Sequence, residues 1–345
     1  MFEIDGGQKS GSGTILRLAV AVSAITQRPL HLVNIRCKRS QSGLKRQHLE
    51  SVLVAAKLCN GVVEGAKLGS EELWFTPNSV EGGCVEAVIE TAGSIPMLFL
   101  AVLPICVYAK RPVILHVAKG GTDTLYAPTV NYLRFVLLPV LSKMGVVAEI
   151  SVQKYGYYPK GLGEASLIVQ PSLLRAVGFE RFGKFDSVNG VSVCTFLSDR
   201  YVAKRQADAA VNVLTKGGYS SRIDVLNDQS NPYQKGSSIT LWAKTDAGAF
   251  IGADALGGLN KSSESVGKEA AIRLVSELKA GSTVDAFLAD MLIPYMALAS
   301  GNSFFYTRCF SEHVETNIWL MKTMLNSEFS VEKVNNSLYR IEKVR

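Results

Sequence analysis

The sequence has few of the features that mark secreted, metal-binding or membrane proteins. Its six cysteines form no CxxC pair and no His-Cys spacing, so we expect buried, reduced thiols and not disulfides or metal ligands. The richest apolar stretch, 95–108, is shorter than the roughly 20 residues that cross a bilayer and contains two prolines. The N-terminus has no basic region followed by an apolar run, as a secretory signal would. We therefore expect a cytoplasmic protein with no membrane contact.

The overall composition is that of an ordinary globular protein. Apolar residues make up 47% and charged residues 19% of the 345 positions. This length exceeds what one hydrophobic core usually organises, so we expect two or three folding units. The net charge of +7 favours an anionic partner such as a nucleotide or RNA, although the same charge would also suit simple solubility.

Helix and strand patterns alternate along the first half of the chain, and their order repeats. The first round predicts helices at 15–25 and 48–59 and strands at 30–36, 62–66, 72–75 and 84–89. The second round predicts helices at 94–108 and 128–144 and strands at 113–117, 147–154 and 164–169. We interpret this order as a degenerate internal repeat.

The pattern changes after Pro171. Residues 182–280 contain strands and helices of their own, and a long apolar helix at 285–300 then resumes the earlier pattern. The sequence therefore predicts an α/β (α+β) protein. Residues 1–181 and 281–345 would form a large domain of repeated units, and residues 182–280 a small inserted α/β domain.

Two segments near the N-terminus have the composition of phosphate-binding loops. The opening loop, 5–14, places glycines and hydroxyls directly before a helix, whose first amides and positive dipole end attract anions. Its spacing fits neither the Walker nor the dinucleotide pattern, and a structural turn is the alternative. The basic segment, 36–48, gathers five cations between a strand and a helix, where they could bind phosphates or remain solvated.

Two further glycine-containing segments have both a structural and a functional interpretation. In the segment 119–128, we expect Asp123 or Thr124 to cap the helix that follows. In the segment 155–164, tyrosines alternate with glycine and lysine. Such rings could stack on the bases of single-stranded RNA, or they could fill a surface groove between strands.

The chain has only four histidines, and three of them fall in strand or helix patterns: His31, His48 and His116. His313 differs because we predict it to lie in a polar loop, between a strand at 303–310 and a helix that begins near Asn317. Neighbouring hydroxyl and amide side chains there could fix one imidazole tautomer, as a nucleophilic histidine requires. A structural role for His313 is the alternative.

Taken together and in this order, the segments resemble the RNA 3′-terminal phosphate cyclase family. The resemblance rests on short motifs spread over nearly the whole chain: ILR, NIR, GL-x-RQHL, VEGA-x-LGS, AGS, VLP, GGTD, G-Y-YP-x-G-x-G, LAD, MALA and H-x-x-TN. It implies a large domain of three similar units, each with two helices and a four-stranded sheet, and a small α/β domain inserted before the last segment. The predicted insertion at 182–280 agrees with that fold.

The resemblance also implies an activity. Members of this family are ATP-dependent ligases that convert an RNA 3′-phosphate into a 2′,3′-cyclic phosphate. By resemblance, His313 attacks the α-phosphorus of ATP and carries AMP; the RNA end then takes the AMP, and the neighbouring 2′-hydroxyl closes the ring. The implied partners are ATP, an RNA with a 3′-phosphate and a divalent ion, expected to be Mg²⁺. Monomer and homodimer are both open.

Other functional positions of the family fall on named residues of this chain. The resemblance implies a nucleotide-binding segment of Phe287, Leu288, Ala289, Asp290 and Met291, in which Asp290 contacts the ribose or a metal ion. It assigns the phosphate groove to Arg17, Arg39, Arg46 and Gln47. Thr14 and Leu100 stand at nucleotide-side positions where the family has Gln, and Ser10 replaces a Glu. We therefore expect altered nucleotide affinity or metal placement.

Two other functions are alternatives. A non-catalytic relative that binds RNA during ribosome or RNA assembly would lack the nucleophilic histidine, whereas this chain has His313 and the Thr-Asn pair. An enolpyruvyl transferase built from similar α/β units would need Lys and Arg around two acidic substrates. Only the cyclase predicts that label from α-labelled ATP becomes bound in an acid-labile, alkali-stable linkage.

Overall fold

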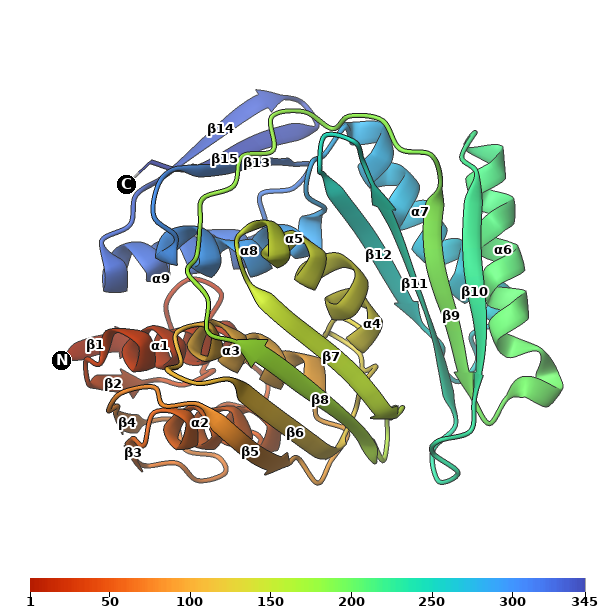
Figure 1. Cartoon of the computed structure of the whole chain (residues 1–345). Coiled ribbons are helices and arrows are strands. Elements are labelled where there is room, and N and C mark those ends of the chain that lie inside the picture. Colours follow the sequence, from red (N-terminus) through yellow and green to blue (C-terminus); the bar gives the residue numbers. More distant parts are fainter. Residues whose placement is uncertain (345) are drawn as a thin grey trace.

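Two sheets of the molecule share one strand order. The structure, a computed structural model that describes residues 1–344, has four small sheets with helices between them (Figure 1). The first two sheets run β1-β2-β4-β3 and β5-β6-β8-β7. In each, the first pair of strands is parallel and the other pairs are antiparallel. The predicted α/β class and the internal repeat are confirmed.

Every helix and strand predicted for the first two units is present, but the strand predicted at 84–89 in the first round is β5, which belongs to the sheet of the second unit. The first comprises β1 (Phe2–Asp5), α1 (Gly13–Thr26), β2 (Leu30–Val33), α2 (Arg46–Leu58), β3 (Val62–Glu64) and β4 (Leu73–Thr76). The second comprises β5 (Gly83–Val88), α3 (Ile95–Val107), β6 (Val113–Gly120), α4 (Val130–Tyr132), the π-helical turn η1 (Leu133–Leu137), α5 (Leu138–Lys143), β7 (Val147–Lys154) and β8 (Gly163–Gln170). The strand predicted at 30–36 ends early, because Asn34 and Arg36 adopt positive φ angles.

The third unit has three strands in its sheet where the resemblance implies four. It comprises α8 (Ala286–Leu298), β13 (Ser303–Thr307), α9 (Glu312–Leu325), β14 (Phe329–Asn335) and β15 (Leu338–Lys343), with the strand order β13-β15-β14. The fourth place is taken by a segment parallel to β13. In it, Val177 accepts a bond from the Phe304 amide and Phe179 donates one to the Phe304 carbonyl, both of 3.0 Å. These bonds are too few to form a regular strand.

Along the chain, a separate sheet is formed between that segment and α8. Its elements are β9 (Val188–Thr195), the 3₁₀ turn η2 (Ser198–Arg200), α6 (Val202–Lys216), β10 (Ser221–Asp228), β11 (Gly236–Lys244), β12 (Phe250–Leu256) and α7 (Ser263–Ala280). The order is β10-β9-β11-β12, and α6 and α7 pack against each other and against the sheet (Figure 1). The Gly- and Ala-containing β12 was not predicted. This sheet and its helices have a separate hydrophobic cluster, which supports the proposed insertion at 182–280. The boundaries of the insertion stay a prediction.

The helices of the three units meet inside the large domain. Helix α1 packs against α3 and α9, and α8 packs against α9. Buried side chains from each unit, such as Ile15, Phe99 and Leu288, belong to one hydrophobic cluster. No helix within residues 1–344 is long and apolar enough to span a membrane. The packing brings the first turns of α1, α2, α8 and α9 close together, which positions the site described below.

All six cysteines are free thiols, but only half of them are buried. Cys59, Cys106 and Cys194 lie in the interior as predicted. Cys37 and Cys84 are exposed, so the prediction of buried thiols is wrong for both. Cys37 follows a turn in the basic segment and Cys84 lies on the outer face of β5, where alternation along the strand directs it away from the helices.

Candidate active site

The segment around His313 is helical and not a loop. The Ser311 hydroxyl accepts a bond of 3.1 Å from the Val314 amide and caps α9, which begins at Glu312. The prediction of a loop followed by a helix near Asn317 is therefore wrong. The polar run that suggested a loop is a serine cap followed by acidic residues, which suit the positive end of a helix dipole.

The electrostatic surroundings keep the His313 ring neutral. Its Nδ1 atom is buried and has no hydrogen-bond partner among residues 1–344. Burial lowers the pKa of His313, and the positive charges of Arg17 and Arg39 lower it further, with only a partial offset by Glu312. At neutral pH the imidazole therefore has a free lone pair on one nitrogen.

The opening loop docks onto the first turn of α9. The Ser10 amide donates to Thr316 Oγ1 at 3.2 Å, and Lys9 Nζ forms an ion pair of 2.8 Å with Glu315 Oε1. The basic segment holds the loop from the other side, because Lys38 Nζ donates to the Lys9 carbonyl at 2.6 Å. Segments from opposite ends of the chain thus enclose the first turn of α9. No sequence pattern signals contacts between residues 306 positions apart.

The start of α1 lies directly against α2. A Cβ atom at Gly13 would come within 2.4 Å of His48 Nε2, so only glycine allows this approach. Burial, together with the charge of Arg17, lowers the pKa of His48 to about 2, so this ring is neutral. The structure gives His48 a packing role, with Nδ1 accepting a long bond of 3.4 Å from the Lys45 amide.

Arg17 and Asp290 form the charged centre of the site. Burial lowers the pKa of Arg17 to about 10, an effect that Asp290 opposes and Arg36 reinforces. Burial and the neighbouring Asp285 raise the pKa of Asp290 to about 7, and Arg17 opposes that shift. Arg17 Nη2 also donates to Thr14 Oγ1 at 3.2 Å. Arg17 is therefore bonded to the opening loop and lies near enough to α8 for Asp290 to affect its pKa.

Helix α8 is tied to α9 by the side-chain amide of Asn317. Asn317 Nδ2 donates to the Asp290 carbonyl at 2.8 Å. The Oδ1 atom of Asn317 is buried without a partner among residues 1–344, as is His313 Nδ1. Asn317 follows His313 by four positions in α9, so the two side chains lie on one face of the helix, one turn apart.

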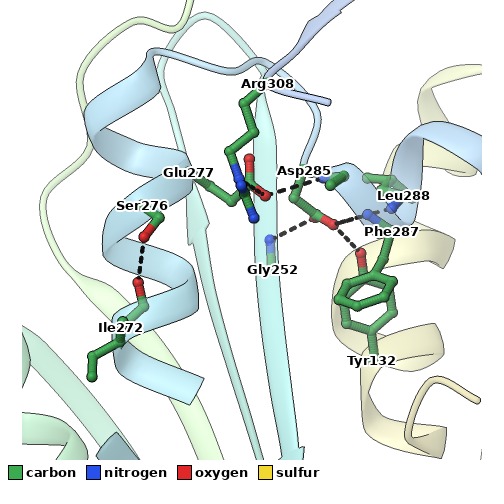
Figure 2. Close-up of polar contacts among 10 residues, drawn as sticks. Tyr132, Gly252, Ile272, Ser276, Glu277, Asp285, Phe287, Leu288 and Arg308 are labelled. Atoms are coloured by element: carbon green, nitrogen blue, oxygen red, sulfur yellow. Dashed lines mark hydrogen bonds and ion pairs between the residues drawn. The ribbon is translucent and has the colours of Figure 1, made fainter. Parts of the chain in front are cut away.

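Asp285 fixes the N-terminus of α8, and the sequence analysis did not single it out. Its Oδ1 accepts bonds of 3.0 Å from the Phe287 and Leu288 amides and one of 2.7 Å from the Tyr132 hydroxyl (Figure 2). Its Oδ2 accepts from the Gly252 amide at 2.9 Å. One carboxylate therefore joins α8 to the second unit and to the insertion.

Glu277 makes a second connection from the insertion. Its Oε1 accepts from the Ala286 amide at 3.2 Å and from Arg308 Nε at 2.6 Å, next to the Asp285 cluster (Figure 2). Arg308 lies just before α9. The end of α7 thus contacts the start of α8 and the approach to the His313 turn. A capping-residue pattern at Asp285 could have predicted that this residue caps α8. No local pattern predicts the contacts of Glu277 with Ala286 and Arg308.

The residues that the resemblance assigns to the nucleotide are only partly brought together. Phe287 is 52% exposed at the start of α8. The side chains of Leu288 and Ala289 are fully buried in the core. Met291 and Leu100 are partly buried and pack against the same core, so the structure shows no polar contact from either.

The implied phosphate-binding residues divide in a similar way. Arg39 is exposed and close enough to His313 to influence its pKa. Arg46 instead faces Glu90, with 3.5 Å between Nη1 and Oε2. Gln47 Oε1 accepts a bond of 2.7 Å from the Ser94 amide, which joins α2 to the start of α3. Arg17 and Arg39 therefore lie near enough to His313 to affect its pKa, whereas Arg46 and Gln47 face the second unit.

Two predictions for the second unit need correction. Thr129, and not Asp123 or Thr124, caps α4, because its hydroxyl accepts from the Tyr132 amide at 3.1 Å. Asp123 is instead buried with its Oδ1 unpartnered among residues 1–344. Tyr155 and Tyr157 are also buried, so the RNA-stacking interpretation of segment 155–164 is wrong for these two rings and applies only to Tyr158, which is 74% exposed.

No group of three or more His, Cys, Asp or Glu side chains within residues 1–344 is arranged to hold a metal ion. Asp290 contributes a single carboxylate beside Arg17. One carboxylate suffices for an ion such as Mg²⁺, which commonly takes most of its ligands from substrate phosphates and water. The donor set therefore fits an ion that arrives with a nucleotide.

Comparison with known proteins identifies the relatives of this chain. The family model described as RNA 3′-terminal phosphate cyclase matches residues 8–331. A protein of Pyrobaculum neutrophilum named RNA 3′-terminal phosphate cyclase is 42% identical over 333 residues, which cover 96% of this chain and 94% of that protein. Proteins with the same name from Pyrobaculum aerophilum and Methanosarcina barkeri are 41% and 40% identical over 99% and 96% of this chain, and 98% and 97% of their own lengths.

Proposed function

The chain belongs to the RNA 3′-terminal phosphate cyclase family, and we propose that it converts RNA 3′-phosphate ends to 2′,3′-cyclic phosphates with ATP, through an AMP covalently bound to His313. The observation that carries this proposal is a neutral histidine in the first turn of a helix, flanked by two arginines. A helix N-terminus favours a bound phosphate, and the arginines can pair with its oxygens.

In the first step, a lone pair of His313 attacks the α-phosphorus of ATP. The new N–P bond forms as the bond to pyrophosphate breaks, so pyrophosphate leaves with its electron pair. The lowered pKa of His313 keeps the ring unprotonated and nucleophilic at neutral pH. Arg17 and Arg39 would stabilise the charge that builds up on the transferring phosphoryl group.

Asn317 would select the reactive nitrogen of His313. Its Nδ2 is held by the Asp290 carbonyl at 2.8 Å, which leaves Oδ1 as an acceptor one helical turn from His313. A proton on His313 Nδ1 could be donated to this oxygen after a small adjustment. The lone pair would then lie on Nε2, and the amide oxygen would stabilise the positive charge of the ring after attack.

The second and third steps use the RNA end. An oxygen of the RNA 3′-phosphate attacks the AMP phosphorus and the N–P bond breaks, which restores His313. The adjacent 2′-hydroxyl then attacks the phosphorus of the RNA 3′-phosphate, and AMP leaves with the electron pair of its bond. Ring closure is favoured because the hydroxyl is already held beside its target.

Asp290 is the residue that would hold a divalent ion accompanying ATP. Its pKa of about 7 means that proton loss, and hence ion binding, would become easier as pH rises through that value. The ion would screen the phosphates of the nucleotide. Ser10 and Thr14 offer hydroxyls in place of further carboxylate or amide ligands, and Thr14 already accepts from Arg17.

The proposal is tested by comparing wild type with His313→Ala and Asn317→Ala. Each protein is incubated with α-labelled ATP and Mg²⁺, and an RNA ending in a 3′-phosphate is then added. We expect acid-labile label on wild type only, discharged as AMP while the RNA end becomes resistant to phosphatase. Asn317→Ala should label slowly, with its pH profile altered, whereas Asn317→Asp should regain part of the rate.

Two results would count against the proposal. Equal labelling of His313→Ala would move the nucleophile elsewhere. A wild-type protein that binds RNA but is never labelled, with several metals and nucleotides, would favour the non-catalytic RNA-binding alternative.

A further inference from the structure

Three loops outside the active site interlock at the boundary between the second unit and the insertion. They are 121–128 after β6, 155–162 between β7 and β8, and 229–235 between β10 and β11. Figure 1 shows the lower end of the β7–β8 hairpin beside the lower end of the β9–β12 sheet. None of these loops contacts the residues assigned to chemistry above. We call them the tyrosine loops.

Buried amide side chains fix the tyrosine loops to one another. Asn231 Nδ2 donates to the carbonyls of Tyr155 and Gly161, at 2.7 and 3.2 Å. Gln234 Nε2 donates to the Tyr158 carbonyl at 3.0 Å, and Gln234 Oε1 accepts from the Lys160 amide at 3.2 Å. Both amides are at most 8% exposed. Such satisfied buried groups make a rigid support.

The third loop joins the same support. The amides of Thr122 and Asp123 donate to the Gly156 carbonyl at 2.8 and 3.1 Å, and the Gly156 amide donates to Thr122 Oγ1 at 3.0 Å. Tyr157 is buried beneath the junction, with Gly236 packed against its ring. Three connections far apart in sequence are therefore held as one surface.

Each of the tyrosine loops carries a tyrosine that points into solvent. Tyr126 is 100% exposed, Tyr158 74% and Tyr233 72%. Rings of this size normally contribute to a core or an interface, so three exposed ones on a rigid support indicate a ligand. Tyr126 also has a φ of +63°, a strained conformation that a simple surface loop has no need to adopt.

The charge of the tyrosine loops favours an anion. Lys160 and Lys235 are exposed beside Tyr158 and Tyr233, and Asp123, the one acidic residue of the three loops, is buried. Aromatic rings combined with cations and no exposed acid are the features of surfaces that bind single-stranded nucleic acid.

The tyrosine loops are continuous with the active-site edge. Gln47, on the helix that follows the basic segment, accepts from the Ser94 amide. Ser94 in turn pairs with Gly121, the first residue of the tyrosine loops, and the Ile95 amide donates to the Gly121 carbonyl at 2.9 Å. These contacts link the start of α2, which carries Gln47, to the tyrosine loops through Ser94.

We propose that the tyrosine loops are a binding site for the single-stranded RNA that precedes the 3′-terminal phosphate, with Tyr126, Tyr158 and Tyr233 stacking on bases and Lys160 and Lys235 contacting the backbone. The proposal rests on the proposed function for the identity of the RNA. It deepens that function, because it explains how a long RNA would be distinguished from a short one.

The test compares wild type with Tyr158→Ala/Tyr233→Ala and with the matched Tyr158→Phe/Tyr233→Phe. Affinity for a fluorescent single-stranded RNA of about 15 nucleotides is measured by anisotropy, without ATP. We expect the alanine pair to weaken binding at least about tenfold, since each lost stack costs about 1–3 kcal/mol, whereas the phenylalanine pair binds like wild type. Binding of a trinucleotide 3′-phosphate should not change.

A second measurement tests the lysines. In Lys160→Met/Lys235→Met, the slope of log affinity against log salt should fall by about 0.7 for each cation removed. Unchanged affinity for the long RNA in the alanine pair, with the fold intact by circular dichroism, would overturn the proposal. Equal weakening with the trinucleotide would also overturn it, because the loss would then lie at the active site.

This test separates the two proposals. The loss of affinity between wild type and the alanine pair, measured without ATP, reports the tyrosine loops, whereas transfer of AMP to wild-type His313 reports the proposed chemistry. A tenfold loss of RNA affinity in a protein that is never labelled would support the RNA site and refute the adenylate.

Discussion

The first and second units have the same strand order but carry different side chains at matching places. In both, a loop leads from the second strand to the second helix. In the first unit this loop contains the cations of the basic segment, beside His313. In the second it contains buried Asp123 and exposed Tyr126. The comparison shows that repeated topology reproduces positions along an edge, while the side chains at matching positions differ in charge and exposure.

The largest expected effect comes from removing a cation of the first unit. Arg39→Ala should slow labelling of the protein by α-labelled ATP about 100- to 1000-fold, because a donor aimed at the developing charge is lost. Arg111→Ala, which removes an exposed arginine of the second unit just before β6, is the matched control and should label normally. Equal slowing in both would mean that net charge, and not position, matters, and the contrast between the units would fail.

The second effect concerns two aspartates near strand ends, Asp5 as the last residue of β1 and Asp123 just after β6. Burial raises the pKa of Asp123 to about 7, so the folded state binds its proton more tightly than the unfolded state. The stability from this group is complete below its unfolded pKa and is lost as pH rises through about 7. Asp123→Asn should therefore be more stable than wild type above neutral pH, by roughly 2–4 kcal/mol, and similar at acid pH.

Asp5 in the first unit should behave in the opposite way. Its pKa is lowered by bonds from the Gly7 amide and the Asn34 side chain. The stability that Asp5 contributes is present at neutral pH and is lost as pH falls through its lowered pKa. Asp5→Asn should therefore be less stable than wild type at neutral pH. Urea unfolding of both variants between about pH 2.5 and 8 checks the pair, because the loss expected for Asp5 lies below the ordinary pKa of an aspartate. Parallel pH dependence would refute the contrast.

Much of the architecture follows from local patterns. The helices and strands of the repeated units are apparent because periodic apolar positions and glycine or proline boundaries are local signals. The Gly- and Ala-containing β12 was missed because it lacks bulky alternating side chains. The first turn of α9 was read as a loop because its serine cap and acidic residues are polar, although these are also features of a helix start.

The candidate site was less predictable than the fold. His313, Arg17 and Asp290 were identified by resemblance, and the structure places Arg17 near enough to both of the others to shift their pKa values. The contacts that hold the opening loop on α9 join distant segments, as Lys9 and Glu315 do. Exposure also has no local signal in a segment such as 155–158, where two tyrosines turn inward and one outward.

A third prediction concerns the first residue of the first helix in each unit. Gly13 has no room for a side chain, since a Cβ would lie 2.4 Å from His48 Nε2, whereas Ile95 fills the same position in the second unit. Gly13→Ala should lose about 1–3 kcal/mol of stability through overpacking. The double variant Gly13→Ala/His48→Ala should recover part of the loss in thermal unfolding. If Gly13→Ala were as stable as wild type, Gly13 and His48 would not approach each other this closely.

The smallest effect separates two histidines at matching places. His31 on β2 lies opposite Glu3, and His116 on β6 lies opposite Glu86. His31 Nε2 and Nδ1 lie 2.8 and 2.7 Å from Glu72 and Glu3, and these bonds raise its pKa. The stability that His31 contributes to the protein is therefore complete below its pKa in the unfolded state. This contribution is lost as pH rises through its pKa in the folded state.

His31→Gln should lower the free energy of unfolding by less than about 1 kcal/mol at about pH 5.5, because exposed ion pairs contribute little. At about pH 9 it should not change the free energy of unfolding. His116 instead has a hydrogen bond of 3.1 Å to the Ser166 hydroxyl, so His116→Gln is the matched control variant. Urea unfolding at both pH values distinguishes the variants. A loss at His31 that persists at alkaline pH would assign its role to stacking on Trp74, whose ring centroid is 4.5 Å away, and not to charge.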